Sequence, residues 1–189
     1  MFLQKTTVLA LLLTLGACAS SSSVTQGVSP YVGQETRSIK ALSEQEIVSY
    51  LEGRGMGFAK PAELNGYPGP MHVLELADAL ALTAEQRTGT ETLMQRHKAE
   101  VRALGKTLIG VEEEIEQLFA TRGVNPALLR DVLAKSADLQ RRIREAHLAT
   151  HLTQSALLTQ EQIASYSKLR GYDASGKAQS STHSHHQLH

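Results

Sequence analysis

Apolar positions recur every three or four residues through the middle of the chain. The positions that share this spacing, one of them a histidine, are Leu93, His97, Val101, Leu104, Leu108, Val111, Ile115 and Leu118. Such spacing places side chains on one face of an α-helix, so it predicts a helix from about Ala84 to Thr121. Gly105 and Gly110 lie within this helix although glycine is a poor helix former. They indicate a bend or a close contact with another helix.

A second long helix is predicted after a short break. Gly123 is a stop signal, Asn125 a suitable N-cap and Pro126 a favoured first helical residue. Apolar side chains on one side continue the helix to about Ala156, at Leu129, Val132, Leu139 and Ile143. Two long helices joined by so few residues lie antiparallel. The pattern therefore predicts an all-α fold built on a long antiparallel helical hairpin.

Short helices are predicted before the hairpin. Ser43 and Glu46 have the spacing of a capping box and start a helix that runs to about Leu51. Turn signals at 65–69 precede Pro70, which is suited to start a helix over Met71–Leu80. The glycine-rich segment at 53–57 is not followed by Gly-Lys-Ser/Thr, so it does not match a phosphate-binding loop.

One five-residue phrase occurs twice, as LTAEQ at 82–86 and as LTQEQ at 158–162. In each copy Thr and Gln have the N-cap and N3 spacing of a capping box, and Leu has the position of a hydrophobic staple. The residues concerned are Leu82, Thr83, Gln86, Leu158, Thr159 and Gln162. Each phrase predicts a helix start, the second for a last short helix through about Leu169. Neither Thr has a neighbouring His or Lys to activate it, so the phrase is a structural device.

The N-terminus has the layout of an export signal. Lys5 precedes an apolar run that is too short to span a bilayer, and the run ends in Leu-Gly-Ala-Cys. This end is similar to a bacterial lipobox and predicts a lipoprotein signal at 1–17, with a lipid anchor on Cys18. Ala19 favours the periplasmic side of the outer membrane. Cys18 is the only cysteine, so disulfides and cysteine-based zinc sites are excluded.

Composition divides the rest of the chain into three parts. Residues 18–38 are rich in Ser, Gly and Thr and read as a flexible tether, whereas 173–189 read as a disordered, His-rich tail. The helical domain is expected over 39–172. Lys and Arg number 19 and Asp and Glu also 19, so the chain offers no electrostatic case for binding nucleic acid.

Two LTxxQ phrases around a long hairpin, behind an export signal, resemble the Spy/CpxP family of bacterial envelope proteins. The chain is also similar to the metal-responsive ZraP and CnrX types, and the resemblance covers about Leu80–Tyr172. It implies a cradle-like antiparallel homodimer. It further implies either an ATP-independent chaperone for unfolded envelope proteins, or a protein that binds metal or restrains a sensor kinase.

Three histidines form the first candidate metal site. In the predicted hairpin His97 lies opposite about residue 150, while His147 and His151 are one helical turn apart on the partner helix. Neutral imidazoles suit Zn²⁺, Ni²⁺ or Cu²⁺, and Glu100 and Glu145 are close enough in sequence to complete a site. The alternative to a metal site is a structural role, in which His97 is a core or boundary residue and His147 and His151 lie on a solvated edge.

Two further groups have a functional and a plain interpretation. The tail histidines are a second metal candidate or simply a solvated tail: His183, His185, His186 and His189. A row of arginines on the second long helix offers charged contacts to a client protein or forms a solvated face: Arg130, Arg141, Arg142 and Arg144.

The leading functional expectation is a lipid-anchored, chaperone-like envelope-stress protein that binds unfolded clients through a helical surface and needs no cofactor. The alternative is a periplasmic heavy-metal-binding sensor or resistance protein that uses its histidines for Zn, Cu or Ni. A purely structural lipoprotein is a third possibility. No set of residues matches an acid–base, nucleophilic or redox arrangement, so an enzyme is not expected.

Overall fold

The computed structural model describes residues 27–172. Residues 27–33 belong to a unit separate from the one that begins at Gln34, and they form turns in which the Val32 N–H donates to the Ser29 carbonyl at 3.2 Å. Cys18, the predicted signal and the tail histidines lie outside the described residues. Among the residues that are described, no helix combines the length and the apolar character needed to cross a bilayer.

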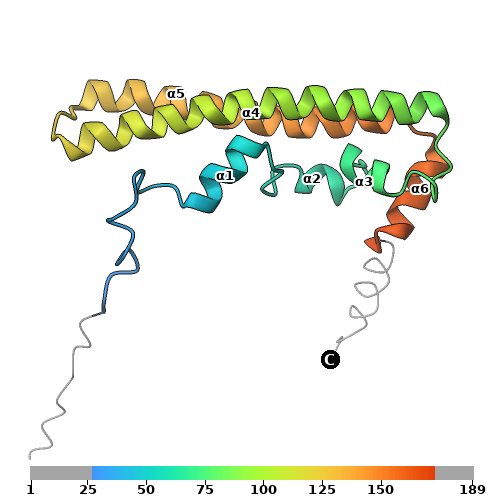
Figure 1. Cartoon of the computed structure of the whole chain (residues 1–189), viewed down its shortest axis with the longest axis horizontal. Coiled ribbons are helices and arrows are strands. Elements are labelled where there is room, and N and C mark those ends of the chain that lie inside the picture. Colours follow the sequence, from blue (N-terminus) through green and yellow to red (C-terminus); the bar gives the residue numbers. More distant parts are fainter. Residues whose placement is uncertain (1–26, 173–189) are drawn as a thin grey trace, which may run out of the picture. The chain divides into compact units, whose positions relative to one another are not determined.

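The predicted all-α hairpin is confirmed within the described unit. Helix α4 spans Ala84–Ala120 and α5 spans Pro126–Ala156, and the two lie antiparallel and side by side along their length (Figure 1). The Asn125 side chain caps α5 by accepting from the N–H groups of Ala127 and Leu128, both at 3.0 Å. The left-handed residue after α4 is Arg122, with φ +56°, and not the Gly123 that the sequence indicated.

The hairpin core lies on the predicted stripe. Leu104 and Leu108 of α4 pack with Leu139 and Ile143 of α5, and Leu108 is 1% exposed. Full burial of each such side chain contributes about 1.5–3 kcal/mol. The α4–α5 pair is therefore a rigid support for whatever packs against it.

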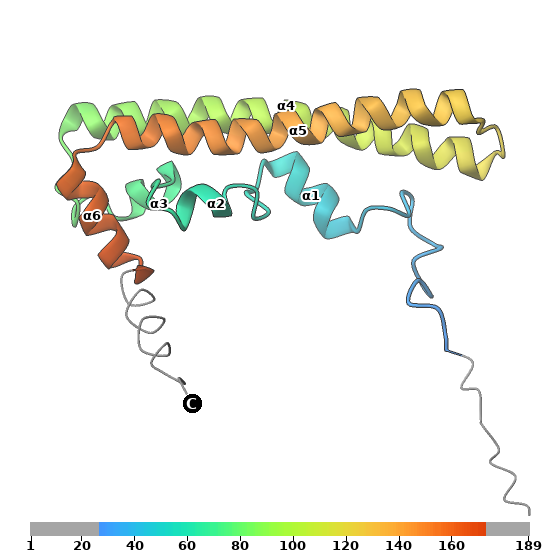
Figure 2. The same ribbon diagram turned by 180° about the vertical axis from the view of Figure 1, so that it is seen from behind.

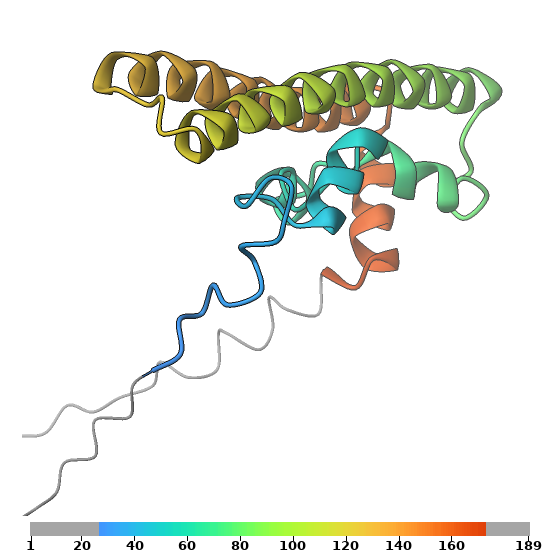
Figure 3. The same cartoon turned by 60° about the vertical axis from the view of Figure 1, so that its left-hand side comes forward.

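Three short helices follow one another along one side of the hairpin. They are α1 (Glu44–Glu52), α2 (Lys60–Glu63) and α3 (Pro70–Glu75). The opposite view and the turned view show that they lie on the same side of α4 and α5 as the last helix, α6 (Gln160–Leu169) (Figures 2 and 3). Helix α2 was not predicted, because four residues are too few to show a period.

Helix α3 ends at Glu75, five residues before the predicted Leu80. Residues 76–81 form turns instead, and Ala81 has φ +48°. These turns place Leu80 in a second core cluster with Val73, Leu158 and Tyr166. Tertiary packing thus outweighs the local preference for continued helix.

Both LTxxQ phrases form complete capping boxes. Thr83 Oγ1 accepts from the Gln86 N–H at 3.2 Å, and the Thr83 N–H donates to Gln86 Oε1 at 3.1 Å. Thr159 and Gln162 repeat these bonds at 3.2 and 2.9 Å. Each phrase thereby satisfies backbone donors that helix starts otherwise leave unpaired.

The two glutamines also bind each other, which the sequence did not indicate. Gln86 Nε2 donates to Gln162 Oε1 at 2.8 Å, and Gln162 Nε2 donates to Gln86 Oε1 at 2.9 Å. The same amides donate to the carbonyls of Leu157 at 2.9 Å and Leu80 at 3.2 Å. The repeated phrase therefore starts two helices and also ties the start of α4 to the start of α6.

Replacing Thr83 with alanine is expected to lower the free energy of unfolding by about 1 kcal/mol, because the N-cap acceptor is lost. Urea denaturation of the full-length protein measures the change. The control is Thr92→Ala, at an exposed position inside α4, where the free energy should be unchanged or slightly higher. An unchanged urea denaturation curve together with lost metal binding would instead give Thr83 a functional role.

Candidate metal site

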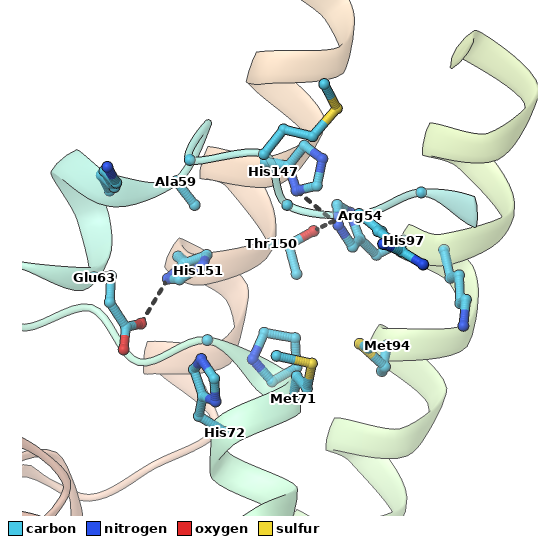
Figure 4. A pocket seen from close by; sticks show the side chains of 18 of the residues that line it. Arg54, Ala59, Glu63, Met71, His72, Met94, His97, His147, Thr150 and His151 are labelled. Carbon is cyan, nitrogen blue, oxygen red and sulfur yellow. Dashed lines mark hydrogen bonds and ion pairs between the residues drawn. The ribbon is translucent and has the colours of Figure 1, made fainter. Parts of the chain in front are cut away.

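A cavity of about 840 Å³ lies between the long helices and the segment that runs from the end of α1 into α3. The three predicted histidines line it together (Figure 4). His97 comes from α4, and His147 and His151 come from α5. The opposite wall includes Glu63 of α2 and Gly69, which precedes α3. Side chains from distant parts of the sequence therefore meet here.

His97 and His147 contact each other directly. His97 Nε2 lies 3.1 Å from His147 Nδ1, and the rings meet edge to face with centroids 4.6 Å apart. Phe58 stacks on the His147 ring at 5.5 Å. His97 Nδ1 lies 3.0 Å from Thr150 Oγ1, so the hairpin register places His97 opposite residue 150, as predicted.

The hydrogen bonds assign the tautomers of this pair. Thr150 Oγ1 donates to the Ala146 carbonyl at 2.8 Å, so it accepts from His97 Nδ1–H. His97 Nε2 then carries a lone pair and accepts from His147 Nδ1–H. The lone pair of His147 is left on Nε2, which is buried and has no hydrogen-bond partner.

Both imidazoles are held in their neutral form. Burial lowers the pKa of His147 to about 4, and the positive charges that His97 and His151 would carry act in the same direction. Burial also lowers the pKa of His97, with a further contribution from His151. Because a metal binds the neutral ring, His147 Nε2 stays available as a ligand well below pH 7.

His151 lines the same cavity but does not join the pair. Its Nδ1 donates to the Tyr67 carbonyl at 2.7 Å and lies 3.7 Å from Glu63 Oε2. This bond leaves the lone pair on Nε2. A Cβ atom on Gly69 would come within 2.8 Å of the His151 ring, so glycine at this position gives the ring its room.

The three imidazoles do not converge into a ready-made metal centre. Within residues 27–172, no group of three or more His, Cys, Asp or Glu side chains is arranged to hold a metal ion. The predicted contact between His97 and His147 is present, whereas His151 is directed to Tyr67 and Glu63. His151 turns away from the pair because the Tyr67 carbonyl and the Glu63 carboxylate attract its ring N–H. Sequence spacing does not reveal these two groups.

Glu63 lines the cavity, although no pattern in the sequence indicated it. Its Oε1 accepts from the hydroxyls of Tyr166 at 2.5 Å and Tyr172 at 2.8 Å, while Oε2 is buried without a hydrogen bond. Burial and the Glu63 carboxylate strongly raise the pKa of Tyr166. The two tyrosines follow Glu63 by more than 100 residues, so no local pattern points to this group.

The other candidates lie elsewhere. Glu100 is exposed, and Glu145 accepts from Arg141 at 2.5 Å on the outer surface of α5. Arg141 also pairs with Asp138 at 2.8 Å. The remaining arginines of the proposed client surface are exposed, at Arg130, Arg142 and Arg144.

Comparison with known proteins gives one family match. A family model described as heavy-metal resistance matches residues 53–165. The matched stretch contains His97, His147 and His151 and both LTxxQ phrases. Neither the curated proteins nor the solved structures give a match to this chain.

Proposed function

Because this chain belongs to the heavy-metal resistance family, we propose that it binds a metal ion in its cavity through the Nε2 atoms of His147 and His151. The family is part of the Spy/CpxP/ZraP-like group of helical proteins and is not a family of enzymes. The observation that carries the proposal is the buried lone pair of His147 Nε2, which has no hydrogen-bond partner.

The surroundings of both rings are those of metal ligands. A ligating histidine usually donates its other ring N–H to a carbonyl, a carboxylate or another acceptor, which orients the ring. His147 Nδ1–H donates to His97, and His151 Nδ1–H donates to the Tyr67 carbonyl. The two residues are four apart on α5, so their rings lie on one face of the helix. In this arrangement His97 is a positioning residue.

The family match favours metal binding over the chaperone-like function that led the sequence-based expectations. It covers the histidine cavity and gives no support to binding of unfolded clients. The arginines of the expected client surface are exposed, and Arg141 is paired with acidic neighbours of the same helix.

Isothermal titration calorimetry with Zn²⁺, Ni²⁺ and Cu²⁺ tests the proposal. The parent protein for the test is the full-length chain with the four tail histidines replaced by serine, which removes a competing site: His183→Ser, His185→Ser, His186→Ser and His189→Ser. We expect it to bind one metal ion. His147→Gln should lower the affinity by about 100-fold, and His97→Gln by about 10–100-fold because only ring orientation is lost.

His72→Gln is the matched control. His72 lines the same cavity, but its Nδ1 lies 2.9 Å from the carboxylate of the exposed Glu75. Its replacement should change the metal affinity by no more than about twofold. A tenfold change would correspond to about 1.4 kcal/mol of binding free energy. The proposal fails if the parent binds no metal once the tail histidines are gone, or if His147→Gln and His151→Gln bind as tightly as the parent.

A further inference from the structure

Methionines gather at the same cavity. The chain has four methionines, and the three after Met1 all line this cavity: Met56, Met71 and Met94. They come from three different segments: the loop after α1, helix α3 and helix α4. Figure 4 shows Met71 and Met94 among the side chains that line the cavity together with His97 and His147. Three separate segments thus each bring a thioether to the cavity that the imidazoles line.

These methionines are not explained as core packing. Met56 is 38% exposed and Met71 is 48% exposed. Met56 also has φ +45°, a left-handed conformation that is unfavourable for a side chain of its kind and is often retained at functional sites. Met94 is half-buried and lies one helical turn before His97, on the same face of α4. Their shared feature is access to the cavity.

We propose that the cavity binds a soft monovalent cation, Cu⁺ or Ag⁺, through these thioethers together with the Nε2 atoms of His147 and His151. The inference rests on the proposed function, because it uses the same imidazoles. Thioether sulfur is a soft, neutral ligand that selects Cu⁺ over harder divalent ions, and Ag⁺ shares this preference. Neither cation needs a carboxylate ligand.

The charges around the cavity favour the same choice. Four basic side chains line the cavity: Arg54, Lys60, Lys98 and Arg102. Only two carboxylates line it, those of Glu52 and Glu63. A divalent ion would meet twice the repulsion that a monovalent ion meets in the same place. The Glu63 carboxylate also already accepts hydrogen bonds from Tyr166 and Tyr172. Neutral sulfur and nitrogen ligands for a single positive charge therefore fit these surroundings better than Zn²⁺ does.

Competitive titrations with Ag⁺, with Cu⁺ under reducing conditions, and with Zn²⁺ test the inference. The protein is the full-length chain with the tail histidines replaced as above and with Cys18→Ser, which removes its only thiol. We expect Ag⁺ and Cu⁺ to bind at least about 100-fold more tightly than Zn²⁺, in line with the softness of the ligands. The double variant Met71→Leu/Met94→Leu should lose about tenfold or more in Ag⁺ affinity and keep its Zn²⁺ affinity.

The control variant is Leu152→Met, which adds a thioether at an exposed position of α5 outside the cavity. It should leave Ag⁺ affinity unchanged. Leucine is close to methionine in volume, so the Met→Leu variants should fold, and thermal unfolding checks this directly. X-ray absorption at the Ag or Cu edge should show sulfur neighbours in the parent. It should not show them in the triple variant Met56→Leu/Met71→Leu/Met94→Leu.

The outcomes separate the two proposals. If Zn²⁺ binds as tightly as Ag⁺ and Cu⁺, or if only nitrogen and oxygen neighbours are seen, the soft-cation inference is wrong. If the methionine variants behave as the parent while His147→Gln loses all three ions, that inference is again wrong and the proposed metal function stands. If the histidine variants bind every ion as the parent does, the proposed function itself fails.

Discussion

Replacing Gly105 with alanine is expected to lower the free energy of unfolding by about 2–3 kcal/mol, because the site has no room for a methyl group. A Cβ atom there would lie 2.6 Å from the Tyr50 carbonyl oxygen and 3.0 Å from its carbonyl carbon. These are backbone atoms of α1, so they move only if the whole helix moves. The glycine is what allows α1 to pack closely against α4.

Gly110 provides the matched control within the same helix. It is exposed, and a Cβ atom added to it would have no neighbour within 4 Å. Gly110→Ala should therefore raise the free energy of unfolding by about 1 kcal/mol, the difference in helix propensity. Urea denaturation of both variants measures the two effects. Equal changes of the same sign would show that helix propensity alone, and not contact with α1, determines the response at Gly105.

Lowering the pH from 7 to 4 is expected to destabilise the metal-free protein by about 3 kcal/mol, mainly through His147. Its pKa is about 4 in the folded protein and 6.5 as an ordinary imidazole. Between these values the unfolded chain binds more protons than the folded one, so stability falls as the pH falls. The contribution is fully present above about pH 6.5 and is lost progressively toward pH 4.

The groups that face His147 explain the shift. His97 and His151 are potential positive charges, and Phe58 stacks on the ring as an apolar neighbour. His97 has a lowered pKa of its own, so it acts in the same direction and makes the pH dependence steeper.

Urea denaturation at pH 7, 5.5 and 4, with a chelator present, measures this dependence. The comparison is with His147→Gln, which cannot titrate and should lose most of the slope. The carboxylates of the exposed Glu46 and the partly buried Glu116 also have lowered pKa values, but they act at lower pH and are the same in both proteins. A slope in His147→Gln as steep as in the parent would mean that folding does not lower the pKa of His147.

Much of the helical framework can be predicted from local sequence. The stripe from Leu93 to Leu118, the break at Pro126 and the three capping boxes predict α1, α4, α5 and α6 close to their observed bounds. These signals work because periodicity and capping depend on residues only a few positions apart. The hairpin register that opposes His97 to residue 150 follows from the same signals.

The composition of the cavity could not be predicted in this way. Glu63 and the methionines contact it only because α2, α3 and the loop after α1 pack along the hairpin. The mutual bonds of Gln86 and Gln162 likewise join residues 76 positions apart. Such contacts arise from packing between distant segments, for which a single sequence has no periodic signal.

Local sequence alone predicts an all-α chain with its hairpin, its helix starts and a position for His97 opposite about residue 150. Only the tertiary structure decides that His151 bonds to Tyr67 and that His147 keeps a buried lone pair. It also decides that three thioethers share their cavity. The physical reason is that a helix depends on contacts within one or two turns, whereas a metal site depends on which atoms distant segments bring together and which other partners they find.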